Sequence, residues 1–145
     1  MSAVNFELKY PPFAVRVKNG DGTTMIFDVI RKKWLVLTPE EWVRQHLLNY
    51  LVTVKKYPAS LIALEKEIVL NDLKKRYDVV IYNRQLQPFI LIECKAPYIE
   101  LDAAVAEQAL RYNLNLKSQF VMITNGVADF VVDKNNNMVE LPDYN

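Results

Sequence analysis

The sequence is poor in the residues that build several common kinds of functional site. Its 145 residues include one cysteine, one histidine and three glycines. One cysteine cannot close a disulfide within the chain, and one cysteine with one histidine cannot supply a Cys/His zinc site. With so few glycines, neither a Walker A phosphate loop nor a dinucleotide-binding fingerprint is present.

Long apolar runs are also lacking, since the longest ones, such as Phe89–Ile92, are far too short to span a bilayer. The first ten residues do not show the basic and then apolar segments of a secretory signal. With 51% hydrophobic and 24% charged residues, the composition is that of an ordinary globular domain. We therefore expect a single-domain cytoplasmic protein without a membrane segment.

The formal net charge of +1 hides an uneven distribution. Residues 31–84 carry 11 basic and 6 acidic groups, a surplus of five, whereas residues 85–145 carry 4 basic and 8 acidic groups, a deficit of four. This asymmetry permits an anionic partner on one face, but ordinary solvation of the surface explains it equally well.

The first 37 residues are predicted to form a β extension. Phe13–Val17 and Thr24–Phe27 flank Asn19–Gly22, a strong hairpin signal, and Trp34–Leu37 is a third short strand. A helix then begins at Pro39, with Thr38 as the N-cap and Glu41 completing a capping box. Its apolar stripe extends to about Lys55 and comprises Val43, Leu47, Tyr50, Leu51 and Val54.

Residues 38–145 predict a core with the order α-β-β-β-α-β. The expected strands are 64–70, 77–82, 89–95, 119–124 and 128–132, and the second helix is 101–116. Strands joined by short turns pair antiparallel, whereas a strand–helix–strand crossover requires a parallel pair. The predicted fold class is therefore α/β, with a mixed (α+β) sheet, helices on its faces and the N-terminal β-hairpin extension.

The strongest candidate site lies on two of these strands. Glu93 and Lys95 are charged residues inside a strand, and residues two apart point to the same face. If the preceding hairpin is centred between Gln85 and Leu86, Asp78 lies opposite Glu93, with the two β-carbons about 5 Å apart. Two carboxylates and an ammonium group would then share one patch of the sheet.

Facing carboxylates repel each other unless a cation lies between them. Oxygen ligands alone favour Mg²⁺ or Mn²⁺, and Lys95 beside them suits metal-assisted hydrolysis of a phosphodiester. Two plain alternatives exist. Lys95 pairs with Glu93 or Asp78 near a sheet edge, or a register shifted by one residue puts Asp78 on the other face.

Asp78, fourteen residues, and then Glu93-Cys94-Lys95 resembles the signature of the PD-(D/E)XK nuclease superfamily, and the order of elements from Thr38 to Gly126 resembles its core. The sequence is more closely similar to the N-terminal nuclease domain of type I restriction enzyme R subunits. The similar segments are TPEEWVRQ, YPASLIALEKEI, KKRYDVVIY, FILIECKAP, QALRYN and ITNG.

The resemblance implies that Asp78 and Glu93 bind a metal ion and that Lys95 is the catalytic lysine. It also implies a role for Gln108 and Tyr112, which match the Q-x-x-x-Y motif of RecB-like members. These two residues are four apart and share a helical face, although an ordinary amphipathic flank has the same pattern.

Further candidates have two explanations each. The superfamily often takes another acidic ligand from the first core helix, and Glu41 is its counterpart, yet helix capping alone explains a glutamate there. Arg44, one turn later, either binds phosphate or pairs with a neighbouring glutamate. Glu65 and Glu67 lie on the strand before the hairpin, and the sequence does not show which one faces the site.

The run Lys74, Lys75 and Arg76 lies just before Asp78 and would neutralise DNA phosphates without reading bases. A solvated turn is the plain alternative. The isoelectric point of 7.8 predicts that this chain alone binds DNA weakly.

The leading hypothesis is a Mg²⁺- or Mn²⁺-dependent DNA endonuclease domain. Its expected partners are DNA, a motor or specificity subunit, or a second copy of the chain. The first alternative is a catalytically silent module that binds nucleic acid or another subunit on the same fold. The second alternative is an oligomeric structural domain in which Glu93 and Lys95 form a buried ion pair.

Overall fold

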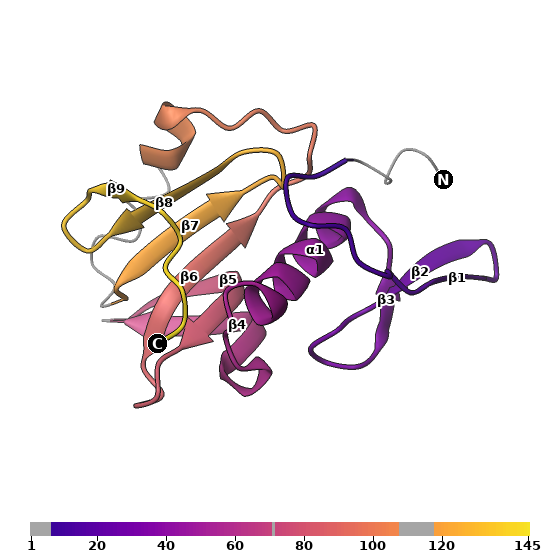
Figure 1. The fold of residues 1–145 in the computed structure, drawn as a ribbon, viewed down its shortest axis with the longest axis horizontal. Coiled ribbons are helices and arrows are strands. Elements are labelled where there is room, and N and C mark those ends of the chain that lie inside the picture. The colour runs from indigo at the N-terminus through magenta and orange to yellow at the C-terminus, as the bar shows by residue number, and fades with distance from the viewer. Residues whose placement is uncertain (1–6, 71, 108–117) are drawn as a thin grey trace.

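The computed structural model describes residues 7–70, 72–107 and 118–145, which form two sheets and one long helix (Figure 1). The small sheet contains β1 (Val17–Gly20), β2 (Thr23–Phe27) and β3 (Trp34–Val36). The helix is α1 (Pro39–Thr53), followed by the 3₁₀ turn η2 (Ala59–Leu61). The large sheet contains β4 (Ile62–Leu70), β5 (Leu73–Tyr82), β6 (Pro88–Cys94), β7 (Phe120–Thr124), β8 (Asp129–Asp133) and β9 (Met138–Val139).

The large sheet is mixed, as predicted. Its strand order is β4-β5-β6-β7-β8-β9, and every neighbouring pair is antiparallel except β6 and β7. The α/β fold class with a mixed sheet is therefore confirmed. Residues 103–107, inside the crossover between the parallel strands, are helical, and the rest of the predicted second helix lies outside the described residues.

Helix α1 begins at Pro39 as predicted, but the predicted capping box is only half confirmed, because the Glu41 carboxylate bonds to Arg44 and Gln45. The Thr38 hydroxyl accepts a hydrogen bond of 3.0 Å from the backbone N–H of Glu41, and Pro39 occupies the first turn. The helix buries Leu47 and Leu51 against the sheet. Val54, predicted to lie on the apolar stripe, is 47% exposed because the helix ends at Thr53.

The core lies between α1 and the large sheet. Val79 and Ile81 from β5 and Ile90 and Ile92 from β6 face the helix and are completely buried. A smaller cluster on the opposite face of the sheet contains Tyr77, Val80 and Leu91. In the part of the chain that the structure describes, no helix is long and apolar enough to cross a membrane.

Both predicted hairpin turns are present. Asp21 and Gly22 adopt left-handed conformations, with φ of 49° and 77°, as the tight turn between β1 and β2 requires. In the loop between β5 and β6, the side-chain oxygen of Asn83 accepts hydrogen bonds of 3.0 Å from the backbone N–H groups of Gln85 and Gln87. This loop sets the register of the two strands that carry the candidate site.

Candidate active site

Strands β5 and β6 form a fork at the positions of Asp78 and Glu93. From Ile81 opposite Ile90 to Val79 opposite Ile92, the last pair, the strands are in the predicted register, although a shift between Ile81 and Tyr82 places Tyr82 opposite Pro88. Beyond that pair, β5 continues only beside β4, and β6 continues only beside β7. Asp78 and Glu93 are therefore next in register but lie on separate arms of the fork.

The alternation of side chains is interrupted at the same place. Val79 faces α1, whereas Tyr77, two residues earlier, packs on the opposite face of the sheet. Glu65, which lies between the paired positions on β4, has a left-handed φ of 51°. An irregularity of this kind re-aims a side chain, and Asp78 turns toward the α1 side of the sheet.

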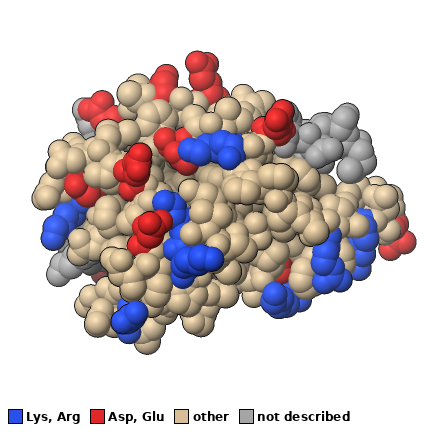
Figure 2. All heavy atoms as spheres, in the orientation of Figure 1, with Lys and Arg blue, Asp and Glu red and all other residues tan. Residues whose placement is uncertain are grey.

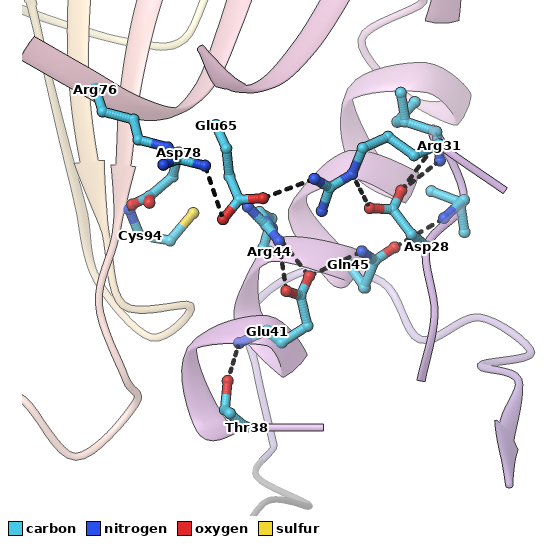
Figure 3. Close-up of polar contacts among 12 residues, drawn as sticks. Asp28, Arg31, Thr38, Glu41, Arg44, Gln45, Glu65, Arg76, Asp78 and Cys94 are labelled. Atoms are coloured by element: carbon cyan, nitrogen blue, oxygen red, sulfur yellow. Dashed lines mark hydrogen bonds and ion pairs between the residues drawn. The ribbon is translucent and has the colours of Figure 1, made fainter. Parts of the chain in front are cut away.

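A pocket lies between this irregularity and the beginning of α1 (Figure 3). Its lining is mainly ionisable and consists of Thr38, Glu40, Glu41, Arg44, Glu65, Asp78 and Cys94. Four of these residues are acidic, and Arg44 is the one basic residue in the lining. The pocket therefore concentrates negative charge beside a single guanidinium group.

Asp78 is a partly buried carboxylate of the pocket that has no ion pair among the described residues. Its Oδ2 accepts a hydrogen bond of 2.7 Å from the backbone N–H of Cys94. Cys94 has no partner residue on β5, because the pairing of β5 with β6 ends at Val79 and Ile92. Burial is the main reason that its pKa is raised, and the nearby Glu93 and Glu40 raise it further. The Cys94 N–H and the Arg44 guanidinium act in the opposite direction without cancelling this effect.

Glu41 and Arg44 form a buried pair on α1. Arg44 donates through Nε to Glu41 Oε2 over 2.9 Å and through Nη2 to Oε1. Gln45 donates a further bond of 2.9 Å to Oε2. Burial would lower the pKa of Arg44, but its bonds to Glu41 raise it overall, so the guanidinium stays charged.

Glu65 connects the pocket to the segment between β2 and β3. Arg31 donates through Nη1 to Glu65 over 2.6 Å and through Nε to the buried Asp28 over 2.8 Å (Figure 3). The pKa of Glu65 is lowered, mainly by the Arg31 hydrogen bond. Arg76 lies 3.8 Å from the other Glu65 oxygen. Of the two candidate glutamates on β4, Glu65 is the one that lines the pocket.

The family model of the type I restriction enzyme R protein N terminus matches residues 39–144. The chain belongs to this family. No curated protein matches the chain. The matched segment begins with α1 and includes the large sheet and most of the residues that line the pocket, whereas β1–β3 and Arg31 precede it.

Within this R-protein N terminus, Asp78 lines the pocket, and the site roles predicted for Asp78, Glu93 and Lys95 stay predictions. Glu93 is bound by Lys75 rather than by Lys95. Because Glu93 alternates with Cys94, which lines the pocket, the Glu93 side chain points to the other face of β6, and Lys95 follows the last residue of the strand. The predicted register is right, but the interrupted alternation turns Asp78 to the other side.

The remaining predicted residues have mixed positions. Arg44 lines the pocket but pairs with Glu41, and Lys75 is engaged by Glu93. Lys74 and Arg76 are exposed on the same arm of β5. Gln108 and Tyr112 lie outside the described residues. The sequence analysis missed the contact of Asp28 and Arg31 with the pocket. Their spacing of three residues indicates a local ion pair, but it does not indicate that Arg31 also binds Glu65 on β4.

The donor chemistry suits Mg²⁺ or Mn²⁺, because carboxylate oxygens are hard ligands. The arrangement does not yet form a metal site, since the described ranges contain no group of three or more His, Cys, Asp or Glu residues placed to hold a metal ion. Glu41 is engaged by Arg44 and Gln45, and Glu93 is engaged by Lys75.

Proposed function

We propose that this chain is a divalent-metal-dependent endonuclease domain that hydrolyses phosphodiester bonds of DNA. The observation that carries the proposal is the partly buried carboxylate of Asp78 at the β5–β6 fork, whose pKa is raised, in a chain of a restriction-enzyme family. A carboxylate with a raised pKa in a pocket lined by other acids is stabilised by a cation.

The proposed metal ligands are Asp78 and Glu93, with Glu41 as a third candidate. A bound Mg²⁺ or Mn²⁺ would act as a Lewis acid on the phosphate and would activate water. Asp78 and Glu93 are adjacent in register on the two arms, and Glu93 joins Asp78 only if it exchanges Lys75 for another partner. The proposed catalytic lysine is Lys95, and Gln108 and Tyr112 are proposed to orient it or the phosphate.

DNA itself supplies a reason for that exchange. Lys75 is partly exposed and holds Glu93, and Lys74 and Arg76 lie on either side of it. A phosphate that binds these three cations competes with Glu93 for Lys75, because both are anions. We therefore propose that DNA binding at Lys74, Lys75 and Arg76 releases Glu93 toward Asp78, and that Arg44 contacts a phosphate in the pocket.

Cleavage of supercoiled plasmid tests the proposal. We expect nicking with Mg²⁺ or Mn²⁺ and none with EDTA. Replacing the proposed catalytic lysine, Lys95→Ala, should slow nicking at least about 100-fold. Lys134→Ala, at an exposed lysine beyond β8, serves as the matched control and should keep the rate. Equal rates for Lys95→Ala and the unaltered chain would overturn the assignment of Lys95.

Metal binding is a second readout that does not require turnover. Calorimetric titration with Mn²⁺ should show binding by the unaltered chain and at least about tenfold weaker binding by Asp78→Asn, because a neutral amide is a poorer ligand for a hard cation. Equal affinities in the two proteins would contradict metal binding at Asp78.

A catalytically silent module is the second candidate, and one observation favours it. Glu41, Glu65 and Glu93 already have cationic partners within the chain. Such a module would bind DNA, a motor or specificity subunit, or a second copy of itself. DNA binding that weakens with salt, without cleavage in any metal, would favour this function over the nuclease.

A further inference from the structure

The outer face of the β1–β3 sheet combines aromatic rings with cations. Phe27 and Trp34 are direct cross-strand partners, and their ring centroids are 5.3 Å apart. The Arg16 guanidinium lies 4.3 Å from the centre of the Phe27 ring, and the Lys18 ammonium lies 4.3 Å from the centre of the Trp34 ring. We call these four residues the aromatic–basic face.

This face points to solvent. Ile26, whose side chain alternates with that of Phe27, is completely buried, so the opposite side of the sheet faces the protein. Arg16 and Lys18 are exposed, and both rings are partly exposed. Lys32 and Lys33, also exposed, lie in the connection that leads into Trp34. Figure 2 shows Lys and Arg side chains gathered over the β1–β3 part of the molecule, at the right.

These cations are available to an anionic ligand. In the described part of the chain, no carboxylate forms an ion pair with Arg16, Lys18, Lys32 or Lys33. The contacts of Arg16 and Lys18 with the rings are worth only about 0.5–1 kcal/mol each at an exposed site. A phosphate can therefore take Lys18 away from Trp34, and the uncovered ring face can then accept a base.

We propose that the aromatic–basic face binds a single strand of DNA, with phosphates on Arg16, Lys18, Lys32 and Lys33 and a base stacked on Trp34. Alternating cations and aromatic rings are the usual means of binding single strands without reading their sequence. The proposal deepens the proposed function, because it takes DNA as the ligand and locates a contact outside the acidic pocket.

The position of the face in the fold supports a DNA strand as the occupant. The connection that presents Lys32 and Lys33 also contains Arg31, which binds Glu65 of the pocket. A strand held on the face therefore lies on an element that is tied to the proposed cleavage site. The face precedes residue 39, where the family match begins, so the family's core does not include it.

Fluorescence anisotropy tests the phosphate contacts. A labelled oligothymidylate of about 20 nucleotides is titrated in EDTA, between about 50 and 200 mM salt. The double variant Arg16→Gln, Lys18→Gln should bind about tenfold more weakly at low salt and lose about 1.4 from its salt slope. Lys56→Gln, Lys134→Gln makes the same charge change at exposed lysines elsewhere and should bind nearly as tightly as the unaltered chain.

Tryptophan emission tests the stacking. In a Trp42→Phe background, Trp34 is the only tryptophan, and saturating oligothymidylate should quench its emission strongly. Circular dichroism confirms that the variants are folded. The proposal is overturned if the unaltered chain does not bind at low salt, if both double variants bind alike, or if Trp34 emission is unchanged at saturation. It is also overturned if an acidic protein added in place of the oligothymidylate quenches Trp34 emission and the oligothymidylate does not.

Because binding is measured in EDTA, this result is separable from the nuclease proposal. Oligonucleotide binding without plasmid cleavage would contradict the nuclease and support the face. Plasmid cleavage with unchanged affinity of the Arg16, Lys18 variant would contradict the face and support the nuclease.

Discussion

At the scale of single residues, Asp78 shows how a fold can hold a charge in an unfavourable place. Its carboxylate is partly buried near Glu93 and Glu40, and among the described residues the Cys94 N–H and the Arg44 guanidinium are the groups that favour its charge. Arg44 already donates two hydrogen bonds to the Glu41 carboxylate. Some other favourable interaction must justify keeping Asp78 there, and we propose that metal binding is that interaction.

The raised pKa of Asp78 predicts the pH dependence of stability. A carboxyl group whose pKa is higher in the folded state favours folding when protonated, so its contribution falls as pH rises above its ordinary value of 3.8. Asp78→Asn should therefore raise the free energy of unfolding at neutral pH, by about 1 kcal/mol, without metal. Urea denaturation in EDTA measures this difference.

The control for this prediction is Asp143→Asn, whose side chain is 75% exposed in an ion pair with Lys55. An exposed pair contributes little, so this variant should unfold like the unaltered protein. A lower stability of Asp78→Asn at neutral pH would show that the carboxylate stabilises the apoprotein and would contradict the prediction.

At the scale of elements, helix α1 carries both structural and candidate functional groups in its first turns. Its beginning could be predicted from Thr38, Pro39 and Glu41 because N-cap chemistry is local. The partner of the Glu41 carboxylate could not be predicted from the sequence. In a helix, the Glu41 side chain can reach either the backbone at the helix start or the Arg44 guanidinium.

The N-cap predicts a measurable effect on stability. Thr38→Ala removes the hydroxyl that accepts from the Glu41 N–H and should lower the free energy of unfolding by about 1 kcal/mol. Thr53→Ala makes the same chemical change at the other end of α1, where the hydroxyl only donates to the Asn49 carbonyl. Urea midpoints should show a clear loss for Thr38→Ala and a smaller one for Thr53→Ala, and the reverse order would contradict the capping role.

At the scale of the whole molecule, polar side chains join the small sheet to the large one. Asp28 accepts from the Arg31 guanidinium and from the backbone N–H groups of Ile30 and Arg31, and Arg31 continues to Glu65. The backbone N–H of Val29 donates to Gln45 of α1 over 3.0 Å. In the ranges that the structure describes, the two sheets share no strand pairing, but the buried Asp28 carboxylate connects them through Arg31 and Glu65.

This connection predicts a sensitivity to acid. Burial would raise the pKa of Asp28, but its bonds from Arg31 and Ile30 outweigh burial and lower it. Its stabilising contribution is therefore complete above its ordinary pKa of 3.8 and is lost as pH falls through the lower value of the folded state. Asp28→Asn should cost about 2 kcal/mol at neutral pH.

Urea denaturation of the unaltered chain and Asp28→Asn from neutral pH to about pH 2 checks this expectation. The difference between the two proteins should shrink as the pH falls below 3.8. A difference that stays constant over this range would show that the charge of Asp28 does not hold the connection.

The sequence predicted what depends on local pattern and failed where two distant segments meet. The register of β5 and β6 could be predicted because Asn83 and Pro88 mark a short loop. The interruption at Asp78 could not be predicted, because it depends on the left-handed Glu65 of the neighbouring strand β4. The Arg31–Glu65 contact spans 34 positions and has no local signature.

The left-handed Glu65 also protects the molecule from association through its sheet. In the described part of the chain, β4 is an outer strand of the large sheet, and a long flat edge invites another chain to add a strand. The change of direction at Glu65 and the charges of Glu65, Lys66 and Glu67 make this edge a poor template for such addition. The same residue that shapes the candidate active site therefore also disfavours edge-to-edge aggregation.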